Sequence, residues 1–138
     1  MSQPSLFGAP DGGSRGNPGP AGYGVRIEQG GQVIELKESC GVATNNVAEY
    51  SGLLCALRWA VAQGVSSLHV RSDSLLLVQQ MKGVYRVKHP GLLPLYEQAK
   101  ALIRQIGKVT FEHVRRELNK DADRLANQAM DDASKSPL

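Results

Sequence analysis

The chain is poor in cysteine and has no long apolar stretch, and these two absences exclude several classes of protein. Its two cysteines, Cys40 and Cys55, show neither metal-binding nor redox spacing. No apolar run approaches the length of about 18 residues that a transmembrane helix needs. The first residues also lack the basic and apolar regions of a signal peptide. We therefore expect a cytoplasmic protein that has no membrane partner.

The overall composition is that of an ordinary globular protein. Hydrophobic residues make up 41% of the 138 residues and charged residues 21%, values that are typical of soluble domains. This length suits one domain with its own core. We expect a single, monomeric domain over residues 1–138, with residues 1–4 and 132–138 as loose ends. The net charge of +3 is compatible with a polyanionic partner, but alone it identifies none.

Hydrophobic periodicity predicts an α/β domain. Alternating apolar residues predict strands, and apolar residues that recur every three or four positions predict helices. The expected order is three strands, a helix, a strand, two helices, a strand and a helix, over residues 5–10, 23–29, 32–42, 47–61, 68–72, 74–82, 92–106, 109–114 and 118–129. The first three strands should form an antiparallel meander, and helical crossovers should join the others.

A glycine-rich stretch from Asp11 to Gly24 separates the first two expected strands. Its glycines and prolines favour a turn, and its glycines permit the backbone to approach another group closely. Asp11 would then lie at the end of the first strand. On this stretch alone, Asp11 is equally compatible with an ordinary turn aspartate and with a functional carboxylate.

Three further carboxylates lie in distinctive motifs. These are Thr-Asn-Asn-Val-Ala-Glu ending at Glu49, Asp-Ser beginning at Asp73, and Asn-Lys-Asp-Ala-Asp-Arg-Leu-Ala around Asp123. Together with the Asp-Gly and Asn-Pro-Gly-Pro opening, they occur in the order and spacing of the type 1 ribonuclease H family, which the chain resembles over about residues 5–131. Residues 82–92 are too few for the basic protrusion of longer members, so the chain resembles the compact form. The resemblance implies a ribonuclease H-like fold, with a five-stranded mixed sheet flanked by about four helices.

The four carboxylates suit the binding of divalent metal ions. Mg²⁺ prefers carboxylate oxygens, and two such ions can activate a water and stabilise the leaving oxygen of a phosphodiester. The resemblance implies two Mg²⁺ ions with substrate bound, or Mn²⁺ as a substitute. It makes Asp11 the bridge between both ions, with Asp73 beside it. Glu49 would serve one ion and the nucleophile, and Asp123 would complete the second ion.

Each of these carboxylates also has a purely structural interpretation. Glu49 suits the dipole of an early helical turn, Asp73 and Ser74 suit the capping of a helix, and Asp123 suits a solvated helix face. The occurrence of all four motifs in order favours the catalytic interpretation.

His113 and two arginines are candidates for a role in turnover. His113 lies at the family position of a histidine that assists product departure or proton transfer, which makes it a candidate catalytic residue. It also shares its strand phase with Val109 and Phe111, which equally suits a histidine packed on the core. Arg115 or Arg116 could contact phosphate instead, and we assign Arg116 to substrate binding.

The remaining candidates would bind the substrate. The resemblance places contacts to sugar and phosphate at Gly12, Asn17, Thr44, Asn45 and Asn46. Amide groups both donate and accept, as the recognition of a 2′-hydroxyl requires. Thr44, Asn45 and Asn46 are equally suited to capping a helix. Leu75 occupies a position where the family often has Gln, which removes one expected hydrogen bond.

The sequence therefore predicts an endonuclease that hydrolyses the RNA strand of RNA–DNA hybrids and leaves 3′-hydroxyl and 5′-phosphate ends. Two alternatives remain open: a module that binds hybrid or double-stranded RNA without cutting, and a nuclease of the same fold that acts on DNA. Concentrated negative charge argues against pure binding, and the asparagine motifs favour ribose. A calcium-binding domain is excluded because the segment from Asp11 lacks the alternating oxygen ligands of an EF-hand loop.

Overall fold

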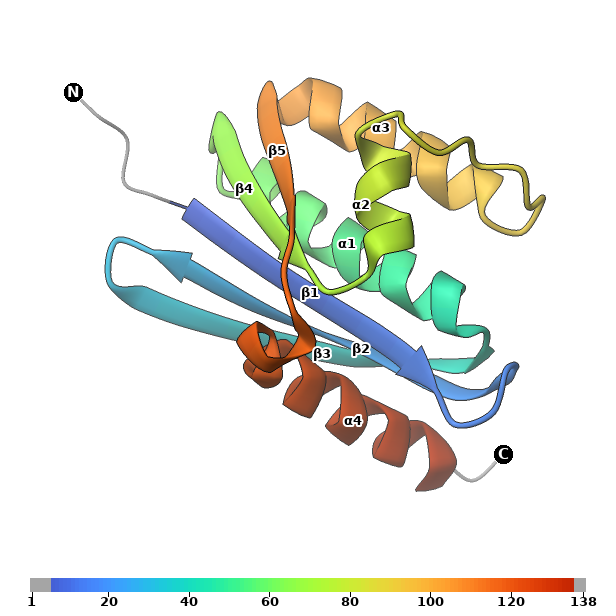
Figure 1. The fold of residues 1–138 in the computed structure, drawn as a ribbon. Helices are drawn as coiled ribbons and strands as arrows, with labels where there is room; N and C mark the ends of the chain where they lie inside the picture. The colour runs from blue at the N-terminus through green and yellow to red at the C-terminus, as the bar shows by residue number, and fades with distance from the viewer. Residues whose placement is uncertain (1–5, 136–138) are drawn as a thin grey trace.

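The structure is a computed structural model that describes residues 6–135 (Figure 1). One sheet has the strand order β3-β2-β1-β4-β5. Its strands are β1 (Leu6–Ser14), β2 (Gly19–Gln29), β3 (Gln32–Ala43), β4 (Ser67–Ser72) and β5 (Lys108–His113). The helices are α1 (Asn45–Ala62), α2 (Leu75–Met81), α3 (Leu93–Ile106) and α4 (Lys120–Lys135), with the short 3-10 helix η1 (Arg116–Leu118) before α4. The predicted α/β class and the predicted order of elements are confirmed.

The sheet is mixed, as expected. β1, β2 and β3 form an antiparallel meander, whereas β4 pairs with β1 in parallel and β5 pairs with β4 in parallel. Because parallel strands point the same way, the C-terminal ends of β1, β4 and β5 lie toward one edge of the sheet. α2 and α3 are joined only by the short segment over residues 82–92, which agrees with the compact arrangement.

The predicted order of strand, turn and strand is confirmed, but most of the glycine-rich stretch is strand, so the strand bounds predicted at residues 10 and 23 are wrong. β1 continues through Asp11, which pairs with Gly24 of β2. The chain reverses only over residues 15–18. Glycine is disfavoured in strands by propensity alone, but packing decides here. A Cβ on Gly24 would lie 2.3 Å from the Cβ of Leu125, so only glycine lets β2 approach α4 this closely.

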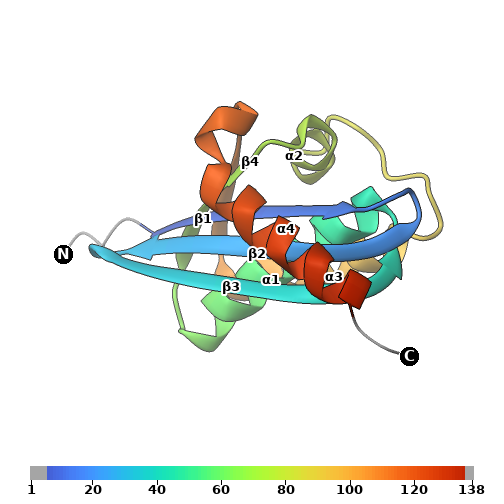
Figure 2. The same ribbon diagram turned by 90° about the horizontal axis from the view of Figure 1, so that it is seen from below.

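Helices cover both faces of the sheet. α1 packs on β1 and β2 and also contacts α3, whereas α4 packs across β1, β2 and β3. Figures 1 and 2 show that α4 lies on the face opposite α1. None of the helices in the described residues combines the length and the apolar character needed to cross a bilayer.

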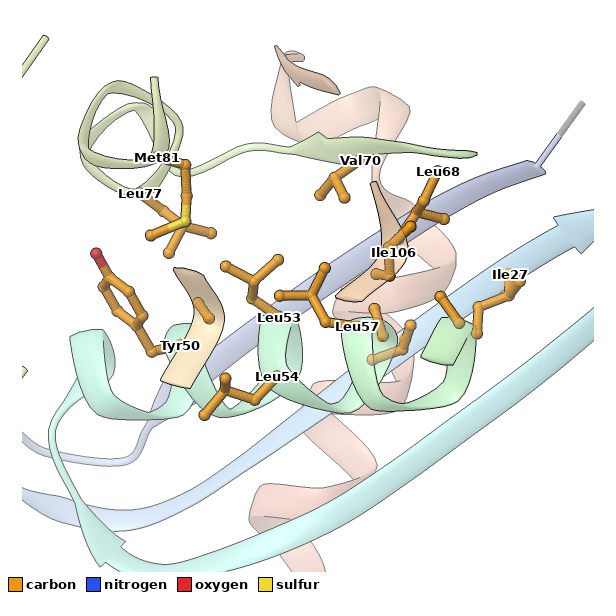
Figure 3. Packing of buried hydrophobic residues seen from close by; sticks show 14 of the residues in the cluster. Ile27, Tyr50, Leu53, Leu54, Leu57, Leu68, Val70, Leu77, Met81 and Ile106 are labelled. Carbon is orange, nitrogen blue, oxygen red and sulfur yellow. The ribbon is translucent and has the colours of Figure 1, made fainter. Parts of the chain in front are cut away.

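The core lies between the sheet and α1. Leu53 and Leu57 of α1 have no solvent exposure, and neither does Val70 of β4. Figure 3 shows these side chains together with Leu77 of α2 and Ile106 of α3. α1 is buried on more than one side because it lies between the sheet and α3, and this burial fixes the position of its N-terminal turns relative to β1.

The last helix extends further toward the C-terminus than predicted. We expected residues 132–138 to be loose, but α4 continues to Lys135, so this prediction is wrong for the first four of them. A salt bridge of 2.8 Å between Arg15 and Asp131 joins the last turns of α4 to the turn that follows β1. The other expected loose ends, residues 1–4 and 136–138, lie outside the described residues.

Candidate active site

Four acidic side chains come from four different elements around one edge of the sheet. Asp11 lies in β1, and Asp73 directly follows β4, the parallel neighbour of β1. Asp123 lies in the first turn of α4, and Glu49 lies in the second turn of α1. Open α/β sheets bind their ligands at the carboxyl ends of their strands. The fold thus directs these four acids toward a position where a ligand can reach them.

Crowding strongly perturbs the carboxyl group of Asp11. Burial, the charge of Asp73, and a hydrogen bond and charge from Asp123 together raise the pKa of Asp11 to about 8, while a hydrogen bond from the backbone of Gly12 acts in the opposite direction. Burial and like charge both disfavour the ionised form. Asp11 therefore interacts electrostatically with Asp73, which follows β4, and with Asp123 of α4.

The other two perturbed acids have both acidic and compensating neighbours. Burial raises the pKa of Asp73, whereas the charge of Arg116 and a hydrogen bond from Asn119 oppose this rise. Burial also raises the pKa of Glu49; a hydrogen bond from Ser74 opposes the rise and the charge of Asp73 adds to it. Glu49 therefore interacts with Asp73, and both acids have donors that favour the ionised form.

The chemistry of this donor set fits a hard divalent cation. All four acids offer carboxylate oxygens, which Mg²⁺ and Mn²⁺ prefer. A bound cation would relieve the repulsion that contributes to the raised pKa of Asp11. Among the residues that the structure describes, no three or more His, Cys, Asp or Glu side chains are gathered tightly enough to hold a metal ion as they stand. Ligation by all four acids therefore stays a prediction.

Close backbone contact between β1 and α1 brings Glu49 toward Asp11. A Cβ on Gly12 would lie 2.3 Å from the carbonyl carbon of Ala48 and 2.6 Å from the backbone nitrogen of Glu49. Only a residue without a Cβ lets the strand and the helix approach so closely. Gly12 therefore has a structural role in the site, and its contact with substrate stays a prediction.

A groove of about 520 Å³ lies beside the acids. Asp11, Glu49 and Asp123 line it, together with the basic side chains of Arg15 and Arg116. Negative and positive groups thus occupy the same walls. This combination suits a polyanion that is cut at a metal-binding position and held through its neighbouring phosphates.

The polar residues at the start of α1 mostly have partners within the chain. Thr44 Oγ1 accepts from the backbone nitrogen of Val47 at 3.2 Å and so caps α1. Asn17 Oδ1 accepts from the backbone nitrogen of Asn45 at 3.0 Å, and Asn45 Oδ1 accepts from that of Ser14 at 2.8 Å. The capping interpretation is therefore right for Thr44. The two asparagines hold the turn after β1 against α1, and their contact with substrate stays a prediction.

Asn46 occupies a different position from Thr44, Asn17 and Asn45. It lines the groove beside the acids and also a second hollow of about 480 Å³. Asn17 and Thr44 line this second hollow, and so does His89, which no sequence motif singled out. Asn46 therefore lies between the acidic groove and a neighbouring surface.

His113 and Arg116 both lie near Asp73. The charge of Arg116 and, to a smaller degree, that of His113 favour the ionised form of Asp73 and lower its pKa. His113 is exposed at the end of β5, an edge strand, so the alternative of a histidine packed on the core is wrong. Arg115 does not line the groove, which favours Arg116 of the two candidate arginines.

Two residues that contact the acids were not selected as site residues from the sequence. Ser74 caps α2, with its Oγ accepting from the backbone nitrogen of Leu77 at 3.2 Å, and it also bonds Glu49. Asn119 is 3% exposed and bonds Asp73. Both belong to the motifs that contain Asp73 and Asp123, so their motif membership was the available signal.

Comparison with known proteins agrees with this architecture. A family model described as reverse transcriptase-like matches residues 9–129. The bifunctional protein Rv2228c of Mycobacterium tuberculosis is 52% identical over 129 residues, which cover 91% of this chain and 35% of that protein. Ribonuclease HI of Halobacterium salinarum is 41% identical over 125 residues, which cover 89% of this chain and 63% of that protein. The chain thus spans about a third of the mycobacterial relative.

Solved structures resemble the chain over nearly its whole length. The N-terminal ribonuclease H domain of Rv2228c, solved as a fusion with maltose-binding protein, has a TM-score of 0.92 at 49% identity and covers 96% of this chain and 98% of its own. LC11-RNase H1 in complex with an RNA/DNA hybrid has a TM-score of 0.88 at 39% identity, with 95% and 100% covered. Because the family model covers most of the chain and these structures share its fold, the chain belongs to the ribonuclease H domains of the reverse transcriptase-like family.

Proposed function

We propose that the chain is an endonuclease that hydrolyses the RNA strand of RNA–DNA hybrids and leaves 3′-hydroxyl and 5′-phosphate ends. The observation that carries this proposal is the direct interaction of Asp11 with Asp73 and Asp123 at the edge of the sheet. One similar protein, LC11-RNase H1, has been solved in complex with an RNA/DNA hybrid. Acids that crowd together beside a groove with basic walls are suited to cutting a phosphodiester rather than only binding it.

Mg²⁺, with Mn²⁺ as its substitute, is the cofactor that this donor set favours. Asp11 would bridge two ions, with Asp73 beside it, Glu49 on one ion and Asp123 on the other. When bound, the two ions would activate a water for attack at phosphorus and stabilise the leaving oxygen. The chain's own part would be to hold the four carboxylates around the ions and to orient the scissile phosphate between them.

Arg116 and His113 would act on the substrate itself. The guanidinium of Arg116 offers several N–H donors that match the oxygens of a phosphate and lines the groove, so it would bind a phosphate next to the scissile bond. His113 is exposed at the end of β5 and near Asp73. Its position would let it act as a general acid that delivers a proton to the departing 3′-oxygen.

Selectivity for ribose would come from residues around the start of α1. Asn17 and Asn45 use their side-chain oxygens within the chain, so their amide nitrogens are the groups to donate to sugar and phosphate oxygens. Asn46 lies between the groove and the second hollow. Together with Thr44 and the backbone of Gly12, these residues would recognise consecutive 2′-hydroxyls, which distinguish RNA from DNA.

The domain would work as a monomer in the cytoplasm. Both cysteines are free in the structure, which suits a reducing compartment such as the cytoplasm. The four acids and the groove come from one chain, so a monomer has a complete site. One sheet and one core account for residues 6–135, so a single domain is sufficient.

A cleavage assay tests the proposed function. Labelled RNA–DNA hybrid, single-stranded RNA, duplex RNA and duplex DNA are each incubated with Mg²⁺, Mn²⁺ or EDTA, beside the variant Asp73→Asn. We expect metal-dependent cutting of the RNA in the hybrid alone, and loss of cutting in the variant. Retention of the hybrid in a gel-shift assay without cutting would make the domain a binding module. Cutting of duplex DNA would support phosphodiester hydrolysis at this site but would show that the substrate is DNA and not the hybrid.

A further inference from the structure

One buried asparagine links three of the elements that carry the acids. Asn119, in the connection between η1 and α4, is 3% exposed. Its Nδ2 donates to the backbone oxygen of Pro10 at 3.3 Å, and its side chain also donates to the carboxylate of Asp73. Its backbone oxygen accepts from the backbone nitrogen of Asp123 at 3.0 Å. Asn119 therefore bonds β1 next to Asp11, the end of β4, and the first turn of α4.

The chemistry of an amide explains why asparagine suits this position. The side-chain nitrogen of asparagine carries two hydrogens, and here one serves a backbone carbonyl and the other a carboxylate. Aspartate has the same shape but no donor when ionised, and it would place another negative charge beside Asp73. Leucine has a similar size but no polar group. A buried donor aimed at a carboxylate fixes the orientation of that carboxylate and favours its ionised form.

The other buried amide in the described residues makes a useful contrast. Gln80 of α2 is 5% exposed, and its side-chain oxygen accepts from the hydroxyl of Tyr50. This hydrogen bond joins α2 to α1 and contacts none of the four acids. Two buried amides thus contribute polar contacts to the same fold, but only Asn119 contacts the proposed site.

We propose that Asn119 is a positioning residue that sets the orientation of the Asp73 carboxylate relative to Asp11 and Asp123. This inference rests on the proposed function, because the orientation matters only if these acids hold metal ions together. Asn119 contacts no substrate in this scheme. It acts through Asp73, as partners that hydrogen-bond to metal ligands generally do.

Three variants test this inference. Asn119→Asp and Asn119→Leu both remove the donor, the first with an added charge and the second without one. Gln80→Leu removes a buried amide elsewhere and is the matched control. For each protein, kcat and KM on a labelled hybrid, the Mg²⁺ concentration for half-maximal rate and the folded fraction from urea unfolding are measured. Mn²⁺ binding without substrate is measured by calorimetry.

We expect both Asn119 variants to lose about 10- to 100-fold in kcat per folded molecule or in metal affinity, the range typical of groups that orient metal ligands. KM for the hybrid should change little, because Asn119 does not touch it. Gln80→Leu should lose stability while its kcat per folded molecule and its Mn²⁺ affinity stay at the wild-type level. A loss in Asn119→Asp without a loss in Asn119→Leu would mean that added charge, not the missing donor, is responsible, and would overturn the inference.

Calorimetry separates this inference from the proposed function. If the wild type binds Mn²⁺ but does not cut the hybrid, the proposed function fails, and weaker Mn²⁺ binding by both Asn119 variants still supports the positioning role. If both variants cut and bind Mn²⁺ like the wild type, the positioning role fails and the proposed function stands. A wild type that neither cuts nor binds Mn²⁺ overturns both.

Discussion

At the scale of single residues, Asp11 couples the site to the stability of the fold. Burial, followed by the charge of Asp73, raises the pKa of Asp11 to about 8, whereas an aspartate in an unfolded chain titrates near about 3.9. The folded state therefore holds this proton more tightly than the unfolded state. The resulting stabilisation is complete below about pH 4 and is lost as the pH rises to about 8.

Replacing Asp11 with Asn removes this pH-dependent loss of stability. We expect Asp11→Asn to raise the free energy of unfolding at pH 9 by about 0.5–2 kcal/mol, the gain that a single stabilising substitution commonly gives. At pH 4, where Asp11 is protonated in the folded state, we expect no such gain. Urea unfolding in EDTA at both pH values measures the difference. An equal change at pH 4 and pH 9 would show that ionisation of Asp11 is not its cause.

Ser74 supports two elements with one hydroxyl. Its Oγ accepts from the backbone nitrogen of Leu77 and bonds Glu49. Loss of an N-cap costs typically about 1 kcal/mol, so we expect Ser74→Ala to lower the free energy of unfolding by about that amount and to slow hybrid cleavage several-fold. Ser74→Asp is the informative control, because it keeps the cap and places a charge beside Glu49. Recovery of both stability and cleavage in Ser74→Asp would contradict a role for the bond to Glu49.

The sequence predicted the identity of the site residues better than it predicted their hydrogen-bond partners. The motifs around Glu49, Asp73 and Asp123 single out the acids because, together and in order, they resemble the type 1 ribonuclease H family. The side-chain partners of Asn119 lie in β1 and directly after β4, far away in the chain, so no local pattern identifies them. The structural interpretation and the functional one also coexist, since Thr44 caps α1 at a position predicted to contact substrate.

At the scale of elements, the separation of β1 and α1 is set by Gly12. An added Cβ would meet the backbone of Ala48 and Glu49 at 2.3–2.6 Å, and backbone cannot rotate away as a side chain can. We expect Gly12→Ala to cost about 1–3 kcal/mol, as overpacking usually does, and to lower cleavage per folded molecule because it moves Glu49 away from Asp11. Thermal unfolding and the hybrid assay measure the two effects.

Gly8 provides the matched control in the same strand. A Cβ there would meet Leu68 Cδ1 at 3.6 Å, an ordinary contact with a side chain. We expect Gly8→Ala to retain both stability and cleavage close to the wild-type values. Similar losses in Gly8→Ala and Gly12→Ala would show that β1 tolerates no added Cβ at either position. The close contact between Gly12 and α1 would then not be the cause of the loss in Gly12→Ala.

Helices were predicted more accurately than the first two strands, for a physical reason. Apolar residues at steps of three and four predict the extent of α1 within a few residues, because its buried side chains keep that spacing. In β1 and β2 the informative residues are glycines, whose usual meaning is a turn. Their function here is to let α1 approach at Gly12 and α4 approach at Gly24, and contacts between distant elements leave no local pattern.

At the scale of the whole molecule, the order of strands and helices was predictable because the connections are short and the hydrophobic residues of most elements recur with the period of a strand or of a helix. The convergence of Asp11 and Asp73 was predicted from their expected positions at the ends of two strands, although Asp11 lies within β1 in the structure. The lengths of β1 and of α4 could not be predicted in this way, because they depend on the packing of α4 across the sheet, which leaves no local sequence pattern.

The repulsion among Asp11, Asp73 and Asp123 should make the stability of the whole domain sensitive to divalent metal ions. An ion that binds only the folded state stabilises it by about 2.7 kcal/mol at 100 times its dissociation constant. We expect Mg²⁺ at constant ionic strength to raise the free energy of unfolding of the wild type, and Asp73→Asn to lose most of this gain. Glu35→Gln is the control, since Glu35 pairs with Arg124 away from the groove, and it should keep the full gain. Equal gains in the two variants would mean that Mg²⁺ acts as a general salt, and the acids at the edge of the sheet would then have no special affinity for it.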